Sequence, residues 1–169
     1  MTPQDWAVEM ALYSKWQNET LFGLCDGLSA AQRDQDLGLF FGSIHATLDH
    51  ILMVDKVLIG FAEHGPPLRA PFEPGTIQIT DYDALKTERA AFDEDLVAFF
   101  RAKPADWLSE TLTFFHPAVG RERTMPRQFW CMQMFNHATH HRAQATTGLH
   151  RLGVDYGITD MPYNPYSQY

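Results

Sequence analysis

The chain has 169 residues, of which 45% are hydrophobic and 20% are charged, a balance that excludes a disordered, collagen-like or rod-like protein and favours one globular domain. Its 21 acidic and 13 basic residues give a formal net charge of −8 at pH 7. The densest basic group, Arg121, Arg123 and Arg127, is interrupted by Glu122, so nucleic acid is not an expected partner. The N-terminus lacks a signal-peptide pattern, and no apolar run approaches the ~20 residues of a membrane span. We expect one cytoplasmic domain over residues 1–169, with no membrane partner.

Helical periodicity and end signals predict four long helices, over residues 2–27, 43–64, 80–103 and 126–152. Thr2 and Thr80 are suited to cap the first and third of these helices. Ser29 is suited to cap a short helical turn that follows the first helix. The tail after the fourth helix carries four tyrosines, and we expect it to be extended and held against the body by their rings.

Two connections differ from the helices in pattern. Residues 65–80 contain Pro66, Pro67, Pro71 and Pro74 and have no helical period, which predicts a long connection. In residues 107–124, two extended stretches flank Pro117-Ala118-Val119-Gly120, a pattern typical of a small hairpin.

Four long helices in one domain indicate an all-α fold, a four-helix bundle. The long second connection can cross the end of such a bundle, which permits the second and third helices to run in parallel. We therefore predict an up-down-down-up order, with a helix 2–helix 3 crossover and a small hairpin excursion before helix 4. Cys25 and Cys131 lie far apart in helical contexts, and we expect two reduced, buried thiols.

Three of the eight histidines form a candidate metal site. His137 and His141 are four residues apart, so both project from one face of the fourth helix, on an apolar stripe that we expect to face the core. On the second helix, the same phase argument turns His50 inward and places His45 about 140° away, on a solvated face. Three neutral imidazoles leave a metal open to water or substrate, as in catalytic sites. We expect that site to lie in an accessible cleft at one end of the bundle.

Three segments resemble the DinB/YfiT-like family of metal-binding four-helix bundles. Residues 12–18 (LYSKWQN) are similar to the family's first helix, and residues 42–51 (GSIHATLDHI) resemble the start of its second helix. Residues 136–144 (NHATHHRAQ) match the family's last-helix motif, which supplies two metal ligands. The resemblance implies a divalent metal on His50, His137 and His141, usually zinc or nickel, and frequently a homodimer.

The resemblance also implies a range of activities, because characterised relatives include thiol-dependent transferases and an isomerase. Our first hypothesis is a metal-dependent enzyme of this kind, acting on a small molecule such as a low-molecular-weight thiol, with Arg142 and Gln144 as candidate substrate-orienting groups. The second hypothesis is a non-catalytic, metal-dependent small-molecule binder or sensor. The third is that the three histidines only contribute to structure.

A second apolar surface on the fourth helix favours a homodimer. Cys131, Phe135 and Leu149 lie about 120–160° from His137, and Met132 lies at about 220°. A helix with one covered face shows polar residues opposite. The alternative to a partner subunit is coverage within the monomer, by the 107–124 excursion or the tyrosine-rich tail.

Overall fold

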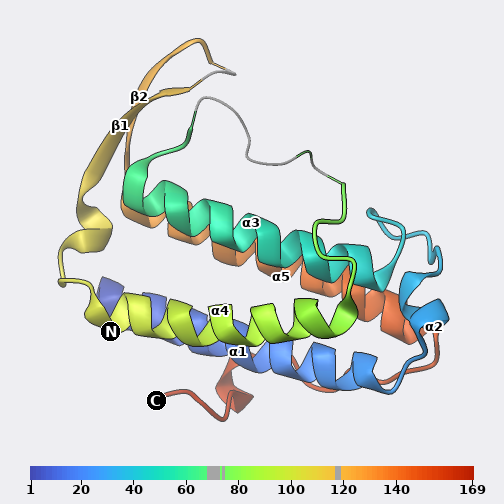
Figure 1. The fold of residues 1–169 in the computed structure, drawn as a ribbon. Coiled ribbons are helices and arrows are strands. Elements are labelled where there is room, and N and C mark those ends of the chain that lie inside the picture. Colours follow the sequence, from blue (N-terminus) through green and yellow to red (C-terminus); the bar gives the residue numbers. More distant parts are fainter. Residues whose placement is uncertain (68–72, 74, 117–118) are drawn as a thin grey trace.

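Four long helices, lying lengthwise beside one another in two pairs, make up most of the structure (Figure 1). The computed structural model describes residues 1–67, 73, 75–116 and 119–169. Within these residues, the elements follow in chain order: α1 (Pro3–Asp26), α2 (Ala30–Asp34), α3 (Ile44–His64), α4 (Tyr82–Ala102), the short η1 (Trp107–Ser109), β1 (Thr111–His116), β2 (Arg121–Pro126), α5 (Arg127–Arg151) and the short η2 (Met161–Tyr163).

The helix starts follow from local capping chemistry. The Thr2 hydroxyl accepts a hydrogen bond from the Asp5 amide, and the Asp5 carboxylate accepts one from the Thr2 amide, which completes the predicted capping box. Ser29 and Gln32 form the same box at α2. For the third long helix, the predicted cap was wrong by one residue: Asp81, not Thr80, caps α4, because its carboxylate reaches the Ala84 amide.

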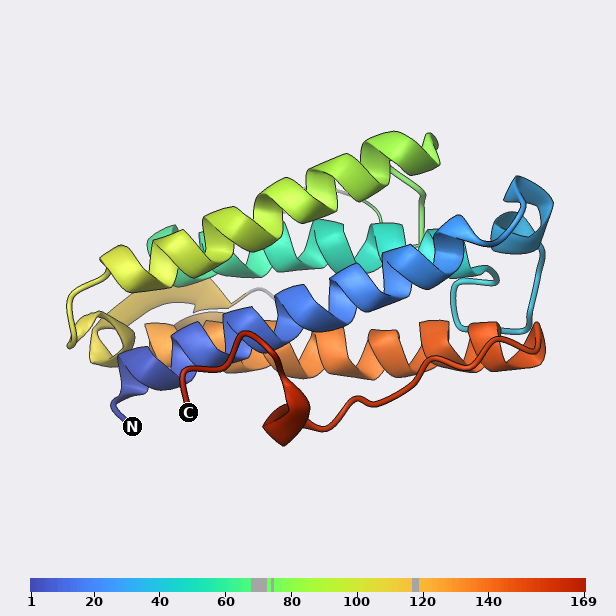
Figure 2. The same cartoon turned by 90° about the horizontal axis from the view of Figure 1, so that it is seen from below.

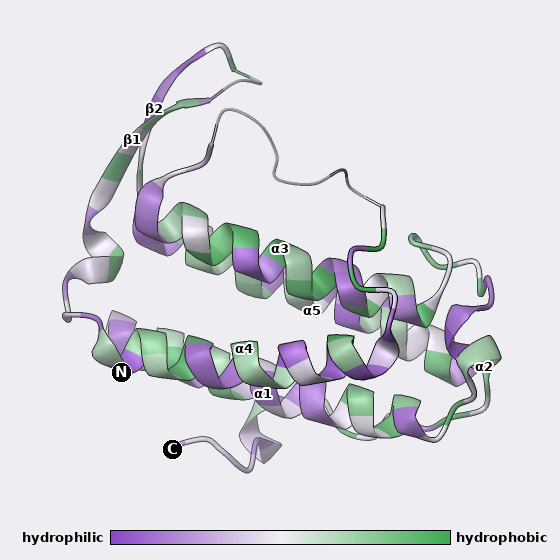
Figure 3. Ribbon diagram, viewed as in Figure 1, coloured by the Kyte–Doolittle hydropathy of each residue, from purple (hydrophilic) through white to green (hydrophobic). Residues whose placement is uncertain are grey.

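The helices associate as an α3–α5 pair and an α1–α4 pair, and the two pairs form two layers (Figures 1 and 2). Figure 1 shows α3 and α4 both beginning at the end of the molecule where α2 lies. Two apolar clusters fill the space between the layers, one around Phe100, Met134 and Phe135 and the other around Ile44, Leu48 and Leu149. Figure 3 shows apolar segments along α3 that are interrupted by hydrophilic ones.

Glycine at position 148 lets α5 approach α3 closely. A Cβ atom at Gly148 would lie 2.8 Å from Cγ1 of Ile44 and 3.0 Å from Cδ1 of Leu39. Ile44 is fully buried, so its branched side chain has little room to retreat. The contact fixes the separation of α3 and α5 about two turns from His141.

The second apolar surface of α5 is covered within the chain. Cys131, Phe135 and Leu149 are at most 2% exposed. Phe135 packs edge-on against Trp6 of α1, with ring centroids 5.7 Å apart, and lies 6.0 Å from the ring of Phe100 in α4. For Phe135 this cover comes from α1 and α4. Trp107 and Leu108, at the start of the predicted excursion, belong to the same apolar cluster, and Val154 and Tyr156 of the tail pack against the cluster that includes Leu149. These three residues therefore no longer indicate a subunit interface, and the homodimer stays a prediction.

The excursion before α5 is the predicted hairpin. Strands β1 and β2 pair antiparallel from Thr111↔Pro126 to His116↔Arg121. Pro117 and Ala118 of the expected turn, and Pro71 and Pro74 of the long connection, lie outside the described residues. The tail runs back along α1 (Figure 2), held by hydrogen bonds from the Tyr13 hydroxyl to the Thr159 carbonyl and from the Tyr166 hydroxyl to Glu19.

None of the helices in the described part of the chain combines the length and apolarity needed to cross a membrane.

We predict that Gly148→Ala lowers the free energy of unfolding. Overpacking against Ile44 costs about 1–3 kcal/mol, and the helix propensity of alanine offsets about 1 kcal/mol of it. Gly23→Ala is the matched control, because a Cβ there meets nothing within 4 Å and alanine should raise the stability by up to about 1 kcal/mol. Urea denaturation of both variants measures the difference. Equal stabilisation by the two substitutions would contradict the close approach.

Candidate metal centre

Helices α3 and α5 bring together the three histidines that the sequence singles out. The Nε2 atoms of His50 and His137 are 3.1 Å apart. The ring centroid of His141 lies 4.9 Å from that of His50 and 4.3 Å from that of His137. One ring nitrogen from each residue lies within 4.8 Å of the other two. No cysteine, aspartate or glutamate of the described residues joins this group.

The three imidazoles lie at the edge of the α3–α5 interface, not at the centre of the core. On α5, the buried residues Cys131, Ala138 and Leu149 centre on a direction about 110° from His137. On α3, the buried residues Ile51, Asp55 and Ala62 lie about 100–140° from His50. The face of α5 that carries His137 and His141 therefore lies along the edge of the α3–α5 interface, which we call the seam, and not at the centre of the core. His50 and His137 remain partly exposed at this seam, and His141 is 7% exposed.

The surroundings keep the three imidazoles neutral. Burial, reinforced by the charge of His141, lowers the pKa of His50 from 6.5 to about 4. Burial and the neighbouring histidines lower the pKa of His137 to about 3, and burial also lowers the pKa of His141. Each ring therefore keeps a nitrogen lone pair at neutral pH, which is the form that binds a metal.

A hydrogen-bonded chain along α5 orients His141. Its Nδ1 lies 2.8 Å from Oε1 of Gln144, so Nδ1–H donates to the amide oxygen and Nε2 is left free on the side of the site. Nε2 of Gln144 in turn lies 3.1 Å from Nε2 of His140. In metal sites, the ring nitrogen of a ligating histidine that does not bind the metal usually donates such a hydrogen bond, which fixes the orientation of the ring. Gln144 thus positions His141, whereas Arg142 is buried against Ser14 and Thr139, away from the three rings.

Two aromatic residues that the sequence analysis did not single out lie against the site. The Phe41 ring stacks on His50 at 4.0 Å between centroids and lies 5.3 Å from His141. The exposed Phe40 ring lies 6.4 Å from His141. Both residues lie in a tight turn that closes with a Gly42 N–H to Leu39 carbonyl bond, and Gly42 there has φ +79°. The sequence signal that could have indicated this contact is the pair of adjacent phenylalanines just before Ser43, the N-cap of α3.

The solvated position expected for His45 was wrong. His45 is only 4% exposed, and its ring nitrogens lie 3.0 Å from an Asp34 carboxylate oxygen and 2.9 Å from the Ile79 carbonyl. The helical wheel correctly turned His45 away from His50, but α2 and the segment before α4 cover this face of α3 and exclude solvent from it. His45 therefore ties two connections to the helix and takes no part in the histidine group.

The donor set fits a divalent metal ion. Two imidazole nitrogens on one tetrahedral zinc are about 3.3 Å apart, given Zn–N bonds of about 2.05 Å. The His50–His137 separation of 3.1 Å is close to that value. Nδ1 of His137 is also buried without a hydrogen-bond partner among the described residues. Three neutral imidazoles suit zinc, nickel, copper or iron.

The chain is thus a helical protein with a three-histidine group that could hold a metal and leave coordination positions open. A family model, the DinB family, matches residues 1–169, and the chain belongs to that family. The comparisons with curated proteins and with solved structures give no match.

The two cysteines offer no further nucleophile. Both are free and fully buried, as predicted. Burial raises the pKa of each thiol from 9.0 to about 12, so neither forms a thiolate at neutral pH.

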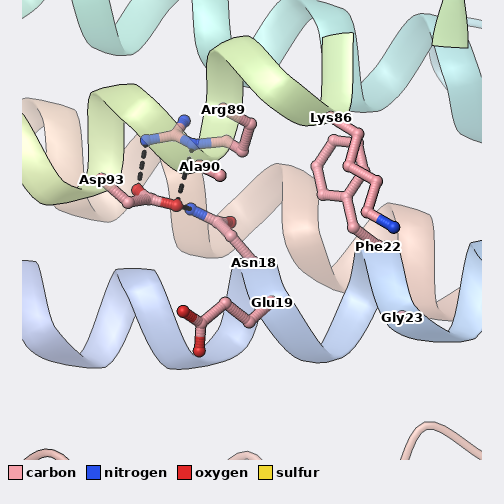
Figure 4. Close-up of a pocket in the computed structure, with 8 residues that line it drawn as sticks. All are labelled: Asn18, Glu19, Phe22, Gly23, Lys86, Arg89, Ala90 and Asp93. Carbon is pink, nitrogen blue, oxygen red and sulfur yellow. Dashed lines mark hydrogen bonds and ion pairs between the residues drawn. The ribbon is translucent and has the colours of Figure 1, made fainter. Parts of the chain in front are cut away.

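A second polar cluster lies on the opposite side of the core, between α1, α3 and α4. The guanidinium of Arg89 and the amide of Asn18 both donate to the Asp93 carboxylate (Figure 4). Arg89 also donates to Asp55 over 2.8 Å. All four residues are at most 2% exposed. The cluster forms the floor of a cavity of about 200 Å³ whose walls include Phe22, Gly23 and Ala90. Arg89 bridges both aspartates, so the cluster ties the layers together through a shared ion pair.

Asp55 is the least satisfied member of this cluster. Its Oδ1 has no hydrogen-bond partner within the described part of the chain. Burial raises the pKa of Asp55 from 3.8 to about 6, although the charge of Arg89 opposes the shift. Between these two values, the folded state keeps a proton that the unfolded state releases. The stabilisation from this raised pKa is therefore complete below about pH 3.8 and is lost as the pH rises through about 6.

We predict that the stability difference between the wild type and Asp55→Asn depends on pH in this direction. The free energy of unfolding of the wild type minus that of the variant should fall between about pH 4 and pH 7, because asparagine does not titrate. Urea denaturation at a series of pH values measures both. The difference cancels contributions from the histidines. A difference that rises with pH would show that Arg89, not burial, controls the titration of Asp55.

Proposed function

We propose that this protein binds one divalent metal ion, zinc or nickel, through His50, His137 and His141 and uses it to act on a small molecule. The observation that carries the proposal is the meeting of three neutral imidazole rings from two helices, with Nε2 of His50 and His137 only 3.1 Å apart. Without a metal, one buried and two partly buried rings at this separation would leave polar nitrogens poorly satisfied. Membership of the DinB family supports the same reading.

A thiol-dependent transferase or isomerase is the activity that this site supports best. A bound zinc or nickel ion lowers the pKa of a coordinated thiol and so supplies a thiolate nucleophile at neutral pH. The histidine group includes no aspartate or glutamate among the described residues, so it contains no carboxylate that could serve as a general base. A thiol, with a pKa near 8.5, needs that base far less than water does. Phe40 and Phe41 provide an apolar wall that keeps water from part of the site.

A non-catalytic binder or sensor is the alternative function. The same open coordination position would hold a ligand without reaction, and nothing in the three imidazoles distinguishes the two cases. The assay of thiol transfer below separates them, and the metal content separates both from a purely structural role.

Two finer features of the architecture belong to this proposal. The helix directions visible in Figures 1 and 2 support the up-down-down-up bundle. A homodimer rests on the family resemblance, and Phe129 and Met132 of α5, 43% and 45% exposed, are available for an interface.

We predict that His50→Ala abolishes stoichiometric zinc binding, because only two ligands remain. Gln144→Leu, which leaves the ligands intact but removes the support of His141, should weaken zinc binding about 10–100-fold. His150→Ala on the exposed side of α5 is the matched control and should bind zinc as the wild type does. Elemental analysis and competitive titration of protein without a histidine tag measure the effect. Equal zinc affinity in His50→Ala and His150→Ala would refute the ligand assignment.

We predict that the zinc- or nickel-loaded protein accelerates conjugation of a small thiol to chlorodinitrobenzene. In this reaction a carbon–sulfur bond forms as the carbon–chlorine bond breaks, chloride departs and the thiol proton passes to solvent. Cysteine, N-acetylcysteine and glutathione are the thiols to compare, and His50→Ala should be inactive. Retained metal without acceleration for any thiol would favour the non-catalytic binder.

A further inference from the structure

The inner face of the hairpin covers a cavity that no part of the proposed metal site uses. The cavity has a volume of about 400 Å³, enough for a small organic ligand. Leu58 of α3, Met125 of β2, and Phe129 and Trp130 of α5 supply its apolar lining. Its polar lining residues are His116, Arg123 and Gln133.

The strand register explains why these residues face the cavity. Arg123 lies directly opposite Phe114 in the hairpin, so the two side chains share one face. Phe114 is only 9% exposed and packs against Trp130, with centroids 5.4 Å apart, which identifies that face as the inner one. Phe115, the next residue, is 48% exposed and lies on the outer face.

Arg123 is the charged group of this cavity, and it has no acidic partner. Arg89 pairs with Asp55 and Asp93, and Arg127 pairs with Glu110. Arg33 and Arg142 form no ion pair with the described residues, but their guanidinium groups donate to carbonyl or hydroxyl oxygens of the chain. Arg123 forms no ion pair or side-chain hydrogen bond with the described residues, and no acidic residue lines the cavity. In a protein with a net charge of −8, an uncommitted guanidinium beside an apolar cavity favours an anionic ligand.

Two further nitrogens at the cavity lack partners. Nδ1 of His116 and Nε1 of Trp130 are buried, and neither forms a hydrogen bond within the described part of the chain. A buried N–H group without an acceptor is costly.

The cavity and the histidine group lie on one face of α5. Trp130 and Gln133 lie within about 40° of His137 around the helix axis, and seven residues separate Trp130 from His137, a rise of about 10 Å. Gln133 lies between them, one turn before His137. An extended ligand of this length would therefore reach from the hairpin to the three imidazoles along the α3–α5 seam.

We infer that the cavity beneath the hairpin binds the carboxylate end of an elongated apolar acid, with Arg123 as the residue that selects for the acid. The apolar stem lies against Leu58, Met125 and Trp130. Only the placement of the far end, at His50, His137 and His141, rests on the proposed metal-dependent function.

Octanoate and octanamide test the inference, because both extend about 10 Å and differ only in charge at one end. Calorimetric titration of the metal-free protein should show octanoate binding at least about tenfold tighter than octanamide. Arg123→Gln should remove that preference. Arg101→Gln is the charge control, because Arg101 is exposed on α4 and does not line the cavity. The indole N–H resonance of Trp130, assigned with Trp130→Phe, should shift on binding.

Each outcome of these titrations decides the matter. Equal weakening by both arginine substitutions would reduce the effect to general attraction of anions, and equal binding of acid and amide by the wild type would exclude carboxylate selection. No octanoate binding below about 10 mM would overturn the inference outright. The comparison of octanoate with octanamide uses only the wild-type protein, so it still tests carboxylate selection if an arginine variant fails to fold.

A separate measurement tests whether the far end of the ligand reaches the metal at His50, His137 and His141. Octanoate carrying a thiol at its far end should bind zinc-loaded protein at least about tenfold tighter than metal-free protein. No gain from zinc would overturn the shared seam while leaving the anion cavity in place. If the protein binds neither zinc nor nickel, the proposed function fails, and the metal-free titrations still test the cavity.

Discussion

The close approach of α3 and α5 is the constraint on which the candidate site depends. Gly148 leaves no room for a Cβ atom beside Ile44, so the two helices pack at a short separation near the end where α3 begins. At that separation, side chains on the edges of the two helices meet across the seam, and His50 comes within 3.1 Å of His137. A larger distance between the axes of α3 and α5 would separate His50 from His137 and His141, because a histidine side chain is too short to span the added distance.

The ionisable residues of the buried Arg89 cluster and those of the α3–α5 seam differ in how they are paired. Hydrogen bonds and a shared ion pair link four buried residues and so join α1, α3 and α4: Arg89, Asp55, Asp93 and Asn18. At the seam, His50, His137 and His141 are kept neutral by burial and by one another. Arg123 further along the seam has no partner among the described residues. The paired side stabilises the fold, whereas the unpaired side offers ligand chemistry.

Wheel angles found the histidine pair but centred the core on His137, whereas the buried residues of α5 spread from Gly148, about 20° from His137, to Phe135, about 160° away. The apolar stripe through His137 and the apolar group around Phe135 are both real, and amphipathicity alone does not say which one faces the other helices. Trp6 and Phe100 cover Phe135, so the larger side chains face the core and the histidines lie beside it. His45 was misplaced for a related reason, since its cover comes from α2 and the segment around Ile79, which the sequence does not position.

The sequence by itself determined the helix ends, the hairpin and the identity of the three histidines, because capping, strand alternation and i,i+4 spacing act between near neighbours in the chain. It also predicted the free, buried cysteines from their type and setting. Only the tertiary structure decided which helices pair, that Phe41 lies over His50, and that Arg123 meets Trp130 at one cavity. These contacts join residues far apart in the chain, and packing of whole helix faces, not local preference, selects them.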